Sequence, residues 1–198
     1  MENKELLYDQ QLNIKTSGRD DSKANNFNYP YEPTDYVVLE RVAESGYFTK
    51  KSRLIDYGCG KGRVSFFLAY QTGCKAIGVE YDERLYNRAL ANLERYPKPY
   101  NVSFENINAV KYVVPAEADR FFFFNPFSVE VLKSVIAKIK ESYDEAPREM
   151  LLFFYYPSDE YVAMLVSDEE LTSTDEIDCQ DLFGKEDPRE RVIIFKLS

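Results

Sequence analysis

The chain has 198 residues, 44% of them hydrophobic, and its 34 acidic and 25 basic residues leave a formal net charge of −9. This length and apolar content suit one domain with a full core. The acidic charge argues against a nucleic acid as partner, because proteins that bind nucleic acids usually carry a basic face. Histidine is absent and the three cysteines are scattered, so histidine-based catalysis is excluded, and neither a zinc site nor any other bound metal is expected.

The polar N-terminal segment, residues 1–28, is rich in Asn, Asp, Lys and Ser. We expect it to form a mobile arm with a short helix near residues 6–12, followed by one domain at 29–198. The chain begins without the apolar run of a signal peptide and has no apolar span of about 20 residues. We therefore expect a cytoplasmic protein that does not contact a membrane.

The first helix of the domain is expected after the sequence YEPT, with Thr34 as its N-cap, Asp35 in its first turn and Gly46 as its stop. Beyond it, strand and helix patterns alternate. The expected strands are 53–57, 75–81, 101–107, 119–125, 149–156, 171–183 and 191–197. The expected helices are 63–72, 82–96, a helix capped by Ser128, and 159–165.

This alternation predicts an α/β fold, in which a mostly parallel sheet of seven strands carries helices on both faces. The last two strands are joined only by the turn-like sequence GKEDPRE at 184–190. A connection this short cannot make a parallel crossover, so the final pair of strands is expected to be antiparallel.

The sequence LIDYGCGKG at 54–62 places Gly58, Gly60 and Gly62 between a strand and a helix, with Asp56 just ahead of them. A loop of this kind turns tightly and lets a ligand approach the backbone and the free N–H groups of the next helix. The third glycine of the dinucleotide fingerprint would fall at position 63, which is Arg63, so an NAD-dependent oxidoreductase is disfavoured.

These residues resemble the first motif of the class I S-adenosylmethionine (SAM)-dependent methyltransferases. The resemblance runs from about residue 29 to the C-terminus and implies their Rossmann-like fold, with an antiparallel final strand. The sequences YEPT, DYGCGKGR and FNPF further resemble a small bacterial subgroup without an established substrate. The implied activity is methyl transfer from SAM to an unidentified acceptor, with S-adenosylhomocysteine (SAH) as product.

The resemblance also implies a set of cofactor contacts. They are Asp56, Gly58, Cys59, Gly60, Gly62, Glu80, Tyr81, Asn108, Ala109 and Asn125. Glu80 matches the acid that binds both ribose hydroxyls, and Asn108 matches the residue that meets the adenine edge. Chemistry supports this assignment, since one carboxylate suits a ribose diol through charge-assisted hydrogen bonds. Cys59, inside the glycine loop, is expected to serve packing and not nucleophilic catalysis.

The candidate catalytic residues are Asn125, Tyr31 and Glu32. Asn125 opens an Asn-Pro-Phe sequence that partly resembles the motif of amino-group methylases, although that motif has two prolines. Tyr31 and Glu32 belong either to a helix-capping turn or to a lid over the methionine end of SAM, with Glu32 as a candidate acid or base. Two alternatives stay open: an N-methyltransferase of nucleic acid or protein that uses the NPF sequence, and a SAM-binding module without catalysis.

Overall fold

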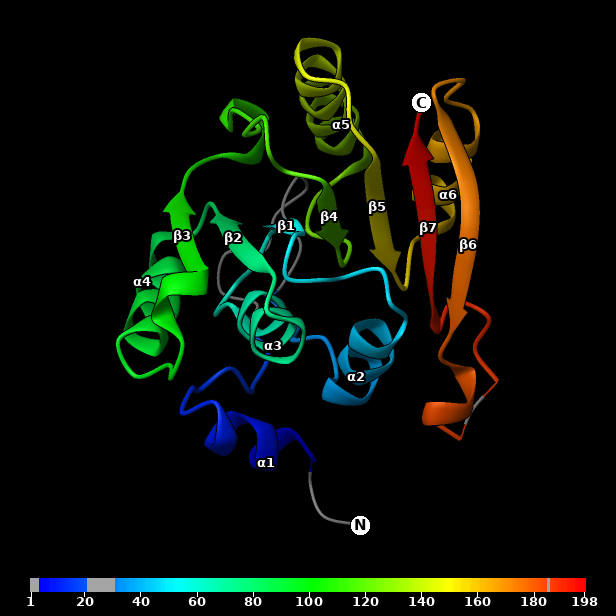
Figure 1. The fold of residues 1–198 in the computed structure, drawn as a ribbon. Helices are drawn as coiled ribbons and strands as arrows, with labels where there is room; N and C mark the ends of the chain where they lie inside the picture. The colour runs from blue at the N-terminus through cyan, green and yellow to red at the C-terminus, as the bar shows by residue number, and fades with distance from the viewer. Residues whose placement is uncertain (1–3, 21–30, 185) are drawn as a thin grey trace.

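A computed structural model describes residues 4–20, 31–184 and 186–198 (Figure 1). Its centre is a seven-stranded sheet in the order β3-β2-β1-β4-β5-β7-β6. The strands are β1 (Arg53–Tyr57), β2 (Lys75–Glu80), β3 (Val102–Asn106), β4 (Arg120–Phe123), β5 (Met150–Tyr155), β6 (Leu171–Asp178) and β7 (Arg191–Leu197). β1 to β5 are parallel, and β7 is antiparallel to both of its neighbours, so the predicted sheet is confirmed.

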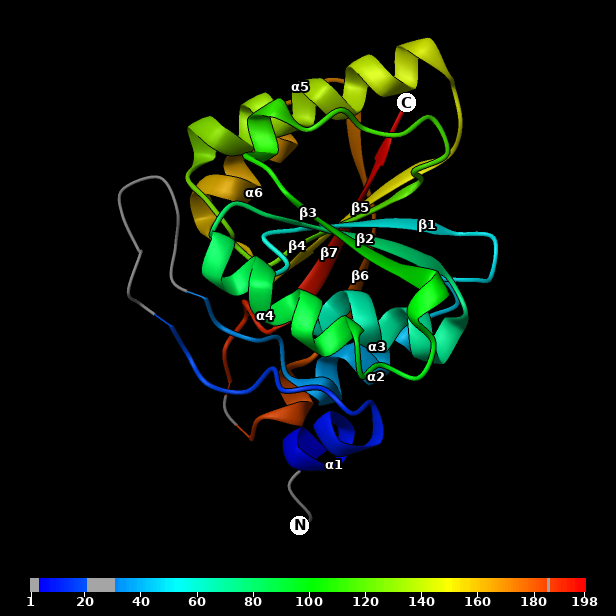
Figure 2. The ribbon, with the colours of Figure 1, turned by 90° about the vertical axis from the view of Figure 1, so that its left-hand side faces the viewer.

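Helices cover both faces of the sheet, as predicted. Figure 2 shows α5 and α6 on one face, and α2, α3 and α4 on the other. The helices are α1 (Lys4–Gln11), α2 (Tyr36–Glu44), α3 (Arg63–Thr72), α4 (Glu83–Leu93), α5 (Val129–Glu145) and α6 (Asp159–Val166), with the 3-10 turns η1 (Pro99–Asn101), η2 (Ala109–Lys111) and η3 (Gln180–Leu182). In the described part of the chain, no helix is long and apolar enough to cross a membrane.

Two buried apolar clusters hold the layers together, one on each face of the sheet. Side chains that alternate along a strand enter different clusters because successive side chains point to opposite faces. In β4, for example, Phe122 joins the cluster on the face of α2 and α3, while Phe121 and Phe123 join the cluster on the face of α5. The carboxyl ends of the parallel strands therefore rest on a rigid aromatic core.

The start of α2 differs from the prediction. Asp35, not Thr34, occupies the N-cap position, and its side chain makes no capping hydrogen bond. Thr34 is buried, and its carbonyl accepts a hydrogen bond from the Arg63 guanidinium at 3.1 Å. This contact with another helix holds Thr34 one residue ahead of the cap. Gly46 follows the end of the helix with a left-handed φ of 84°, as expected of a helix stop.

The described part of the N-terminal segment packs against the domain. The short helix expected at 6–12 corresponds to α1, which lies beside α2 in Figure 1. Leu12, Ile14 and Thr16 are buried beneath it. The predicted boundary between residues 28 and 29 lies outside the described residues, so the division into an arm and a domain stays a prediction.

Candidate functional site

A cavity of about 660 Å³ opens at the carboxyl ends of β1, β2 and β4. Most of the predicted site residues line it: Tyr31, Glu32, Asp56, Gly58, Cys59, Glu80, Tyr81, Asn108 and Ala109. Three predicted residues, Gly60, Gly62 and Asn125, are not part of this lining. Open α/β sheets bind ligands at this edge of the sheet, so the cavity has the position expected of a cofactor site.

The glycine loop after β1 can form only without side chains at two positions. Gly58 and Gly60 have φ angles of 70° and 56°, which other residues rarely adopt. A Cβ added to Gly58 would lie 2.3 Å from the Cβ of Pro126, and one added to Gly60 would lie 2.1 Å from the Tyr31 ring. The loop is therefore in direct contact with both YEPT and FNPF. Gly62 serves as the N-cap of α3.

Asp56 lies at the floor of the cavity and is almost fully buried. Its Oδ2 accepts hydrogen bonds from the backbone N–H of Ser65, at 3.2 Å, and from the Ser65 hydroxyl, at 2.7 Å. Burial, partly opposed by these bonds, raises the pKa of Asp56 to about 7. No described residue donates to Oδ1, so a ligand ammonium placed there would favour the ionised carboxylate.

Glu80, at the end of β2, ties that strand to the glycine loop. Its Oε2 accepts from the backbone N–H of Gly60 at 2.8 Å, and its Oε1 accepts from the backbone N–H of Asp82 at 2.7 Å. A carboxylate offers about four acceptor positions, so these bonds leave it room to accept from a ribose hydroxyl. Burial raises the pKa of Glu80. The geometry fits a diol held by this side chain.

The next part of the cavity suits a flat aromatic ring. Tyr81 is 58% exposed at its rim, and Ala109 closes its inner wall. The Asn108 side chain caps η2, since its Oδ1 accepts from the backbone N–H of Val110 at 3.0 Å. Among the described residues, its Nδ2 group has no partner. That amide is available to donate a hydrogen bond to a ring nitrogen.

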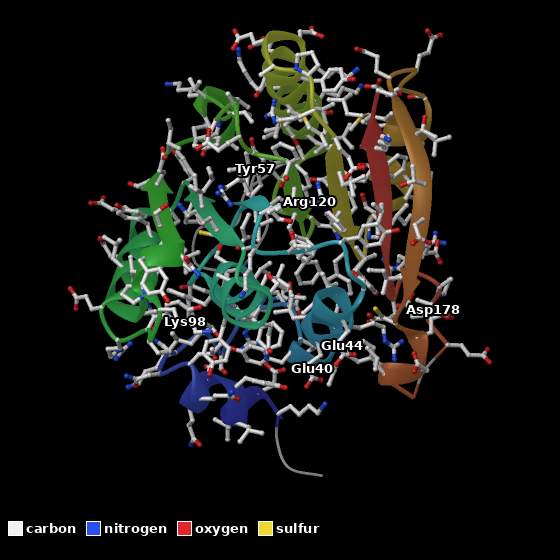
Figure 3. The ribbon with its side chains drawn as sticks, in the orientation of Figure 1. Glu40, Glu44, Tyr57, Lys98, Arg120 and Asp178 are labelled. Atoms are coloured by element: carbon white, nitrogen blue, oxygen red, sulfur yellow. The ribbon has the colours of Figure 1, made fainter. Side chains whose placement is uncertain are left out.

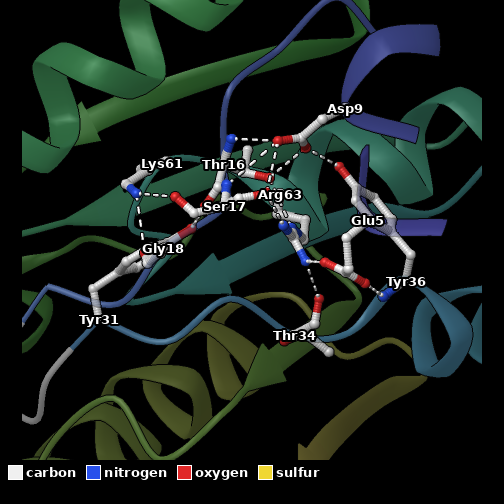
Figure 4. A network of polar contacts seen from close by, with 10 residues as sticks. All are labelled: Glu5, Asp9, Thr16, Ser17, Gly18, Tyr31, Thr34, Tyr36, Lys61 and Arg63. Carbon is white, nitrogen blue, oxygen red and sulfur yellow. Dashed lines mark hydrogen bonds and ion pairs between the residues drawn. The ribbon is translucent and has the colours of Figure 1, made fainter. Parts of the chain in front are cut away.

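Tyr31 closes the opposite end of the cavity. Its hydroxyl donates to the Thr16 carbonyl at 2.7 Å, and the ammonium of Lys61 lies 4.7 Å from the centre of its ring (Figure 4). Burial raises the pKa of Tyr31, so its hydroxyl stays protonated. Glu32 is more exposed and lies 3.8 Å from the guanidinium of Arg19. Tyr31 therefore forms a wall, and Glu32 is the better candidate for moving a proton.

Arg63 has a role at the site that the sequence did not indicate. Its fully buried guanidinium donates to the Thr16 hydroxyl at 2.7 Å and the Thr34 carbonyl at 3.1 Å, pairs with Glu5, and lies 4.3 Å from the centre of the Tyr36 ring (Figure 4). It thus fastens α1 and the start of α2 to the helix that follows the glycine loop. No local pattern in the sequence indicates these partners.

Asn125 is held behind the cavity wall. Its Nδ2 donates to the Tyr156 carbonyl at 2.6 Å, and its Oδ1 accepts from the backbone N–H of Ser158 at 3.2 Å. Its neighbours Phe124 and Pro126 line the cavity instead. A direct contact of Asn125 with cofactor or acceptor stays a prediction.

Cys59 is buried, and burial raises the pKa of its thiol well above the ordinary value. Its sulfur packs against Gly78, where an added Cβ would lie 2.7 Å away. A thiol in this setting is a poor nucleophile, because the thiolate is the reactive form. Within the described residues, no group of three or more Cys, Asp or Glu side chains is arranged to hold a metal ion.

The model of a methyltransferase domain family matches residues 48–146, half of the chain. The chain belongs to this family. The match covers the glycine loop, Glu80, Asn108 and Asn125. It confirms the expected class, the SAM-dependent methyltransferases.

Curated relatives match only in part. A protein-lysine N-methyltransferase of Saccharolobus islandicus is 36% identical over 67 residues, which are 33% of this chain and 42% of the relative. A histone-lysine N-methyltransferase of Dictyostelium discoideum, specific for lysine 79 of H3, is 51% identical over 68 residues, 34% of this chain and 4% of the relative. The chain thus spans less than half the length of these relatives.

Among solved structures, an RNA methyltransferase from Salinibacter ruber in complex with SAH aligns with a TM-score of 0.55. It is 18% identical, and the alignment covers 84% of this chain and 92% of that one. At this identity the likeness shows the fold alone.

Proposed function

We propose that this chain binds SAM in the cavity and transfers its methyl group to the amine nitrogen of a protein side chain. The observation that carries the proposal is the order of groups along the cavity. Asp56 has an oxygen without a donor among the described residues, Glu80 has remaining acceptor capacity, and Asn108 has a free amide. Each residue lies at or just after the end of a neighbouring strand. This order matches the ammonium, ribose and adenine of SAM.

When bound, SAM supplies a methyl group on a sulfonium, which is released as the thioether of SAH when a nitrogen lone pair attacks the methyl carbon. The chain's own contribution is alignment, which is worth up to about 7–11 kcal/mol in favourable cases. Tyr31 and Pro126 both lie against the glycine loop. They would hold the methionine end of SAM in one position. Phe124 lines the cavity beside them and helps to exclude water.

An amine acceptor is supported by the charges beside the cavity. Glu32 lines the cavity, and Asp35 follows it closely in sequence. The carboxylate of Glu190 accepts a hydrogen bond from the Tyr155 hydroxyl at 2.8 Å. The ring of Tyr155 packs on Phe124, which lines the cavity. Burial, together with the carboxylates of Glu5, Glu190 and Glu32, raises the pKa of Asp35. These carboxylates favour an ammonium as acceptor, although Arg63 and Arg84 also line the cavity.

A lysine ammonium must lose a proton before its nitrogen can attack. Glu32 is exposed to solvent at the rim and is our candidate for accepting that proton. The relatives that are named as lysine methyltransferases support the same acceptor class. The overall charge of −9 also favours a basic protein over RNA or DNA as partner.

The proposal is tested with radioactive methyl-labelled SAM and three acceptor pools: polylysine with a basic protein mixture, total RNA, and duplex DNA. We expect label in the protein pool and SAH as product, both lost in the Glu80→Gln variant. Label confined to RNA or DNA would overturn the amine proposal in favour of nucleic-acid methylation. Binding of SAH without transfer to any pool would favour the non-catalytic module.

A further inference from the structure

Part of the cavity wall comes from the N-terminal segment. Residues 12–20, which we call the strap, follow α1 and lead to the cavity. Asp20, at the end of the strap, exchanges two backbone hydrogen bonds of 3.0 Å with Tyr31, and both residues line the cavity. A ligand in the cavity therefore meets a wall whose position depends on where the strap lies.

Lys61 connects the glycine loop to the strap. It lies between Gly60 and Gly62, is 5% exposed, and its ammonium donates to the carbonyls of Ser17 at 2.7 Å and Gly18 at 3.1 Å (Figure 4). Hydrogen bonds from a charged donor are stronger than those between neutral groups. The methyl transfer proposed above does not use this buried charge, so its position in the loop calls for another role.

Two further side chains tie the strap to the site. Asn92, on α4, accepts from the backbone N–H of Lys15 at 2.8 Å and donates to the carbonyls of Lys15 and Lys61 at 3.2 and 3.0 Å. The hydroxyl of Tyr31 donates to the Thr16 carbonyl at 2.7 Å, while its ring packs on the glycine loop. Movement of the strap is thereby linked to the glycine loop and to the wall that Tyr31 forms.

The other end of the strap is anchored away from the cavity. The buried carboxylate of Asp9, on α1, accepts from the backbone N–H of Thr16 at 2.9 Å and from its hydroxyl at 2.6 Å. Helix α1 is held in turn by Glu40 of α2 (Figure 3), which accepts from the Lys4 ammonium at 2.6 Å and from the Tyr8 hydroxyl. Asp9 is not part of the cavity lining, so a substitution there changes the strap without touching a ligand.

We propose that Lys61 is a positioning residue: by holding the strap on the glycine loop it fixes the wall around the methionine half of the cofactor, so that strap docking and cofactor binding strengthen each other. The inference rests on the proposed function, since it takes SAM as the ligand. A ligand that contacts the wall binds the docked arrangement better, which is the condition for such coupling. Coupling is reciprocal, so the cofactor must also stabilise the docked strap. It should act on the amino-acid half of the cofactor, because the adenine is assigned to the opposite end of the cavity, at Asn108.

Lys15 supplies a matched control within the strap. Its side chain is exposed, and its ammonium makes no hydrogen bond or ion pair with a described residue. Lys15→Met and Lys61→Met therefore make the same change in charge and size, and only the second removes bonds between the strap and the glycine loop.

The experiment is calorimetric titration of the full chain, Lys61→Met and Lys15→Met with SAH and with 5′-methylthioadenosine, which lacks the amino-acid part of SAH. We expect Lys61→Met to weaken SAH by about tenfold, within the usual range for coupling between sites, and methylthioadenosine by no more than about twofold. Lys15→Met should bind both ligands within about twofold of the unchanged chain, as a surface substitution does.

Hydrogen exchange measures the reciprocal effect on the strap. In the unchanged chain, SAH should slow exchange of the amides of Lys15 and Thr16, which are bonded to Asn92 and Asp9, and methylthioadenosine should not. In Lys61→Met, SAH should slow this exchange much less. Asp9→Asn weakens the strap from its other end and should reproduce the loss of SAH affinity, so it tests the same coupling if Lys61→Met does not fold.

Equal losses for SAH and methylthioadenosine in Lys61→Met would overturn the inference, because they would indicate general damage to the site. Strap amides whose exchange SAH leaves unchanged would overturn it as well. Failure of the unchanged chain to bind SAH would overturn the proposed function and this inference together. SAH binding that is insensitive to Lys61→Met would overturn the inference alone.

Discussion

The proposed cofactor side of the cavity and the segments behind the cavity wall, which follow β4 and β5, are built by different means. On the proposed cofactor side, Glu80 and Asn108 lie at or just after the ends of β2 and β3. Their side-chain oxygens accept hydrogen bonds from nearby backbone N–H groups. Behind the wall, Asn125 and Tyr156 follow β4 and β5 with left-handed φ angles of 41° and 48°. The first side follows from a motif, whereas the second depends on contacts between segments that are distant in sequence.

The left-handed backbone conformation of these two residues costs free energy, which the surrounding structure must offset. Asn adopts this region more readily than other non-glycine residues, but for a bulky residue such as Tyr156 it is unusual. A conformation of this kind costs about 1–3 kcal/mol. The short bond from Asn125 to the Tyr156 carbonyl and the Arg189 guanidinium over the Tyr156 ring, 4.4 Å from its centre, hold it in place. Asn125 and Tyr156 are therefore the strained positions next to the cavity, and we expect substitutions there to affect stability most.

The largest effect on the cofactor side should come from Glu80→Gln. The variant keeps the shape of the side chain but loses charge-assisted bonds, which are worth about 2 kcal/mol. We expect SAH to bind roughly thirtyfold more weakly by calorimetry. Glu83→Gln, on the exposed first turn of α4, is the control and should bind normally. A loss of SAH affinity of less than about threefold would show that Glu80 does not bind the ribose.

Asn125→Ala tests whether the segment behind the cavity wall can be destabilised without affecting cofactor binding. The variant loses bonds to Tyr156 and Ser158 and leaves alanine in a left-handed backbone, so the free energy of unfolding should fall by about 2 kcal/mol in denaturant titrations. SAH affinity should change by no more than about twofold. Asn87→Ala, exposed on α4, should leave stability nearly unchanged. A large loss of SAH affinity would indicate instead that Asn125 contacts the cofactor directly.

The pH dependence of SAH binding reports on Asp56. Its pKa of about 7 means that the ligand-free carboxyl is protonated below that pH, while the ammonium of SAH requires the ionised form. Affinity should therefore fall as the pH is lowered through 7, by up to about tenfold per unit. In Asp56→Asn this dependence should disappear and binding at pH 7.5 should be weaker. An unaltered pH profile in the variant would assign the titration to another group.

The smallest effect is expected from Tyr81→Ala. Tyr81 is 58% exposed, so its ring can cover only one side of the adenine and should contribute about threefold in SAH affinity. Tyr100→Ala serves as control, because Tyr100 is 77% exposed and lies on η1, outside the cavity lining. Equal effects of the two substitutions would argue that Tyr81 does not contact the ligand.

Most of the fold could be predicted, because its signals are local. Apolar periodicity indicated each strand and helix, and the short turn before β7 indicated the antiparallel pair. Strand ends were less accurate: the strand expected at 171–183 stops at Asp178, and η3 begins two residues later, at Gln180. The N-cap of α2 was misplaced because a hydrogen bond from Arg63 decides where Thr34 lies.

The sequence by itself determined the alternating α/β fold, the glycine loop and the placing of Glu80 at the end of the second strand, because each depends on residues close together along the chain. Only the tertiary structure decided what Arg63 and Asn125 do, since their partners Thr16 and Tyr156 lie 47 and 31 residues away. Burial and hydrogen bonding of such groups are set by how distant segments pack, which no local pattern encodes.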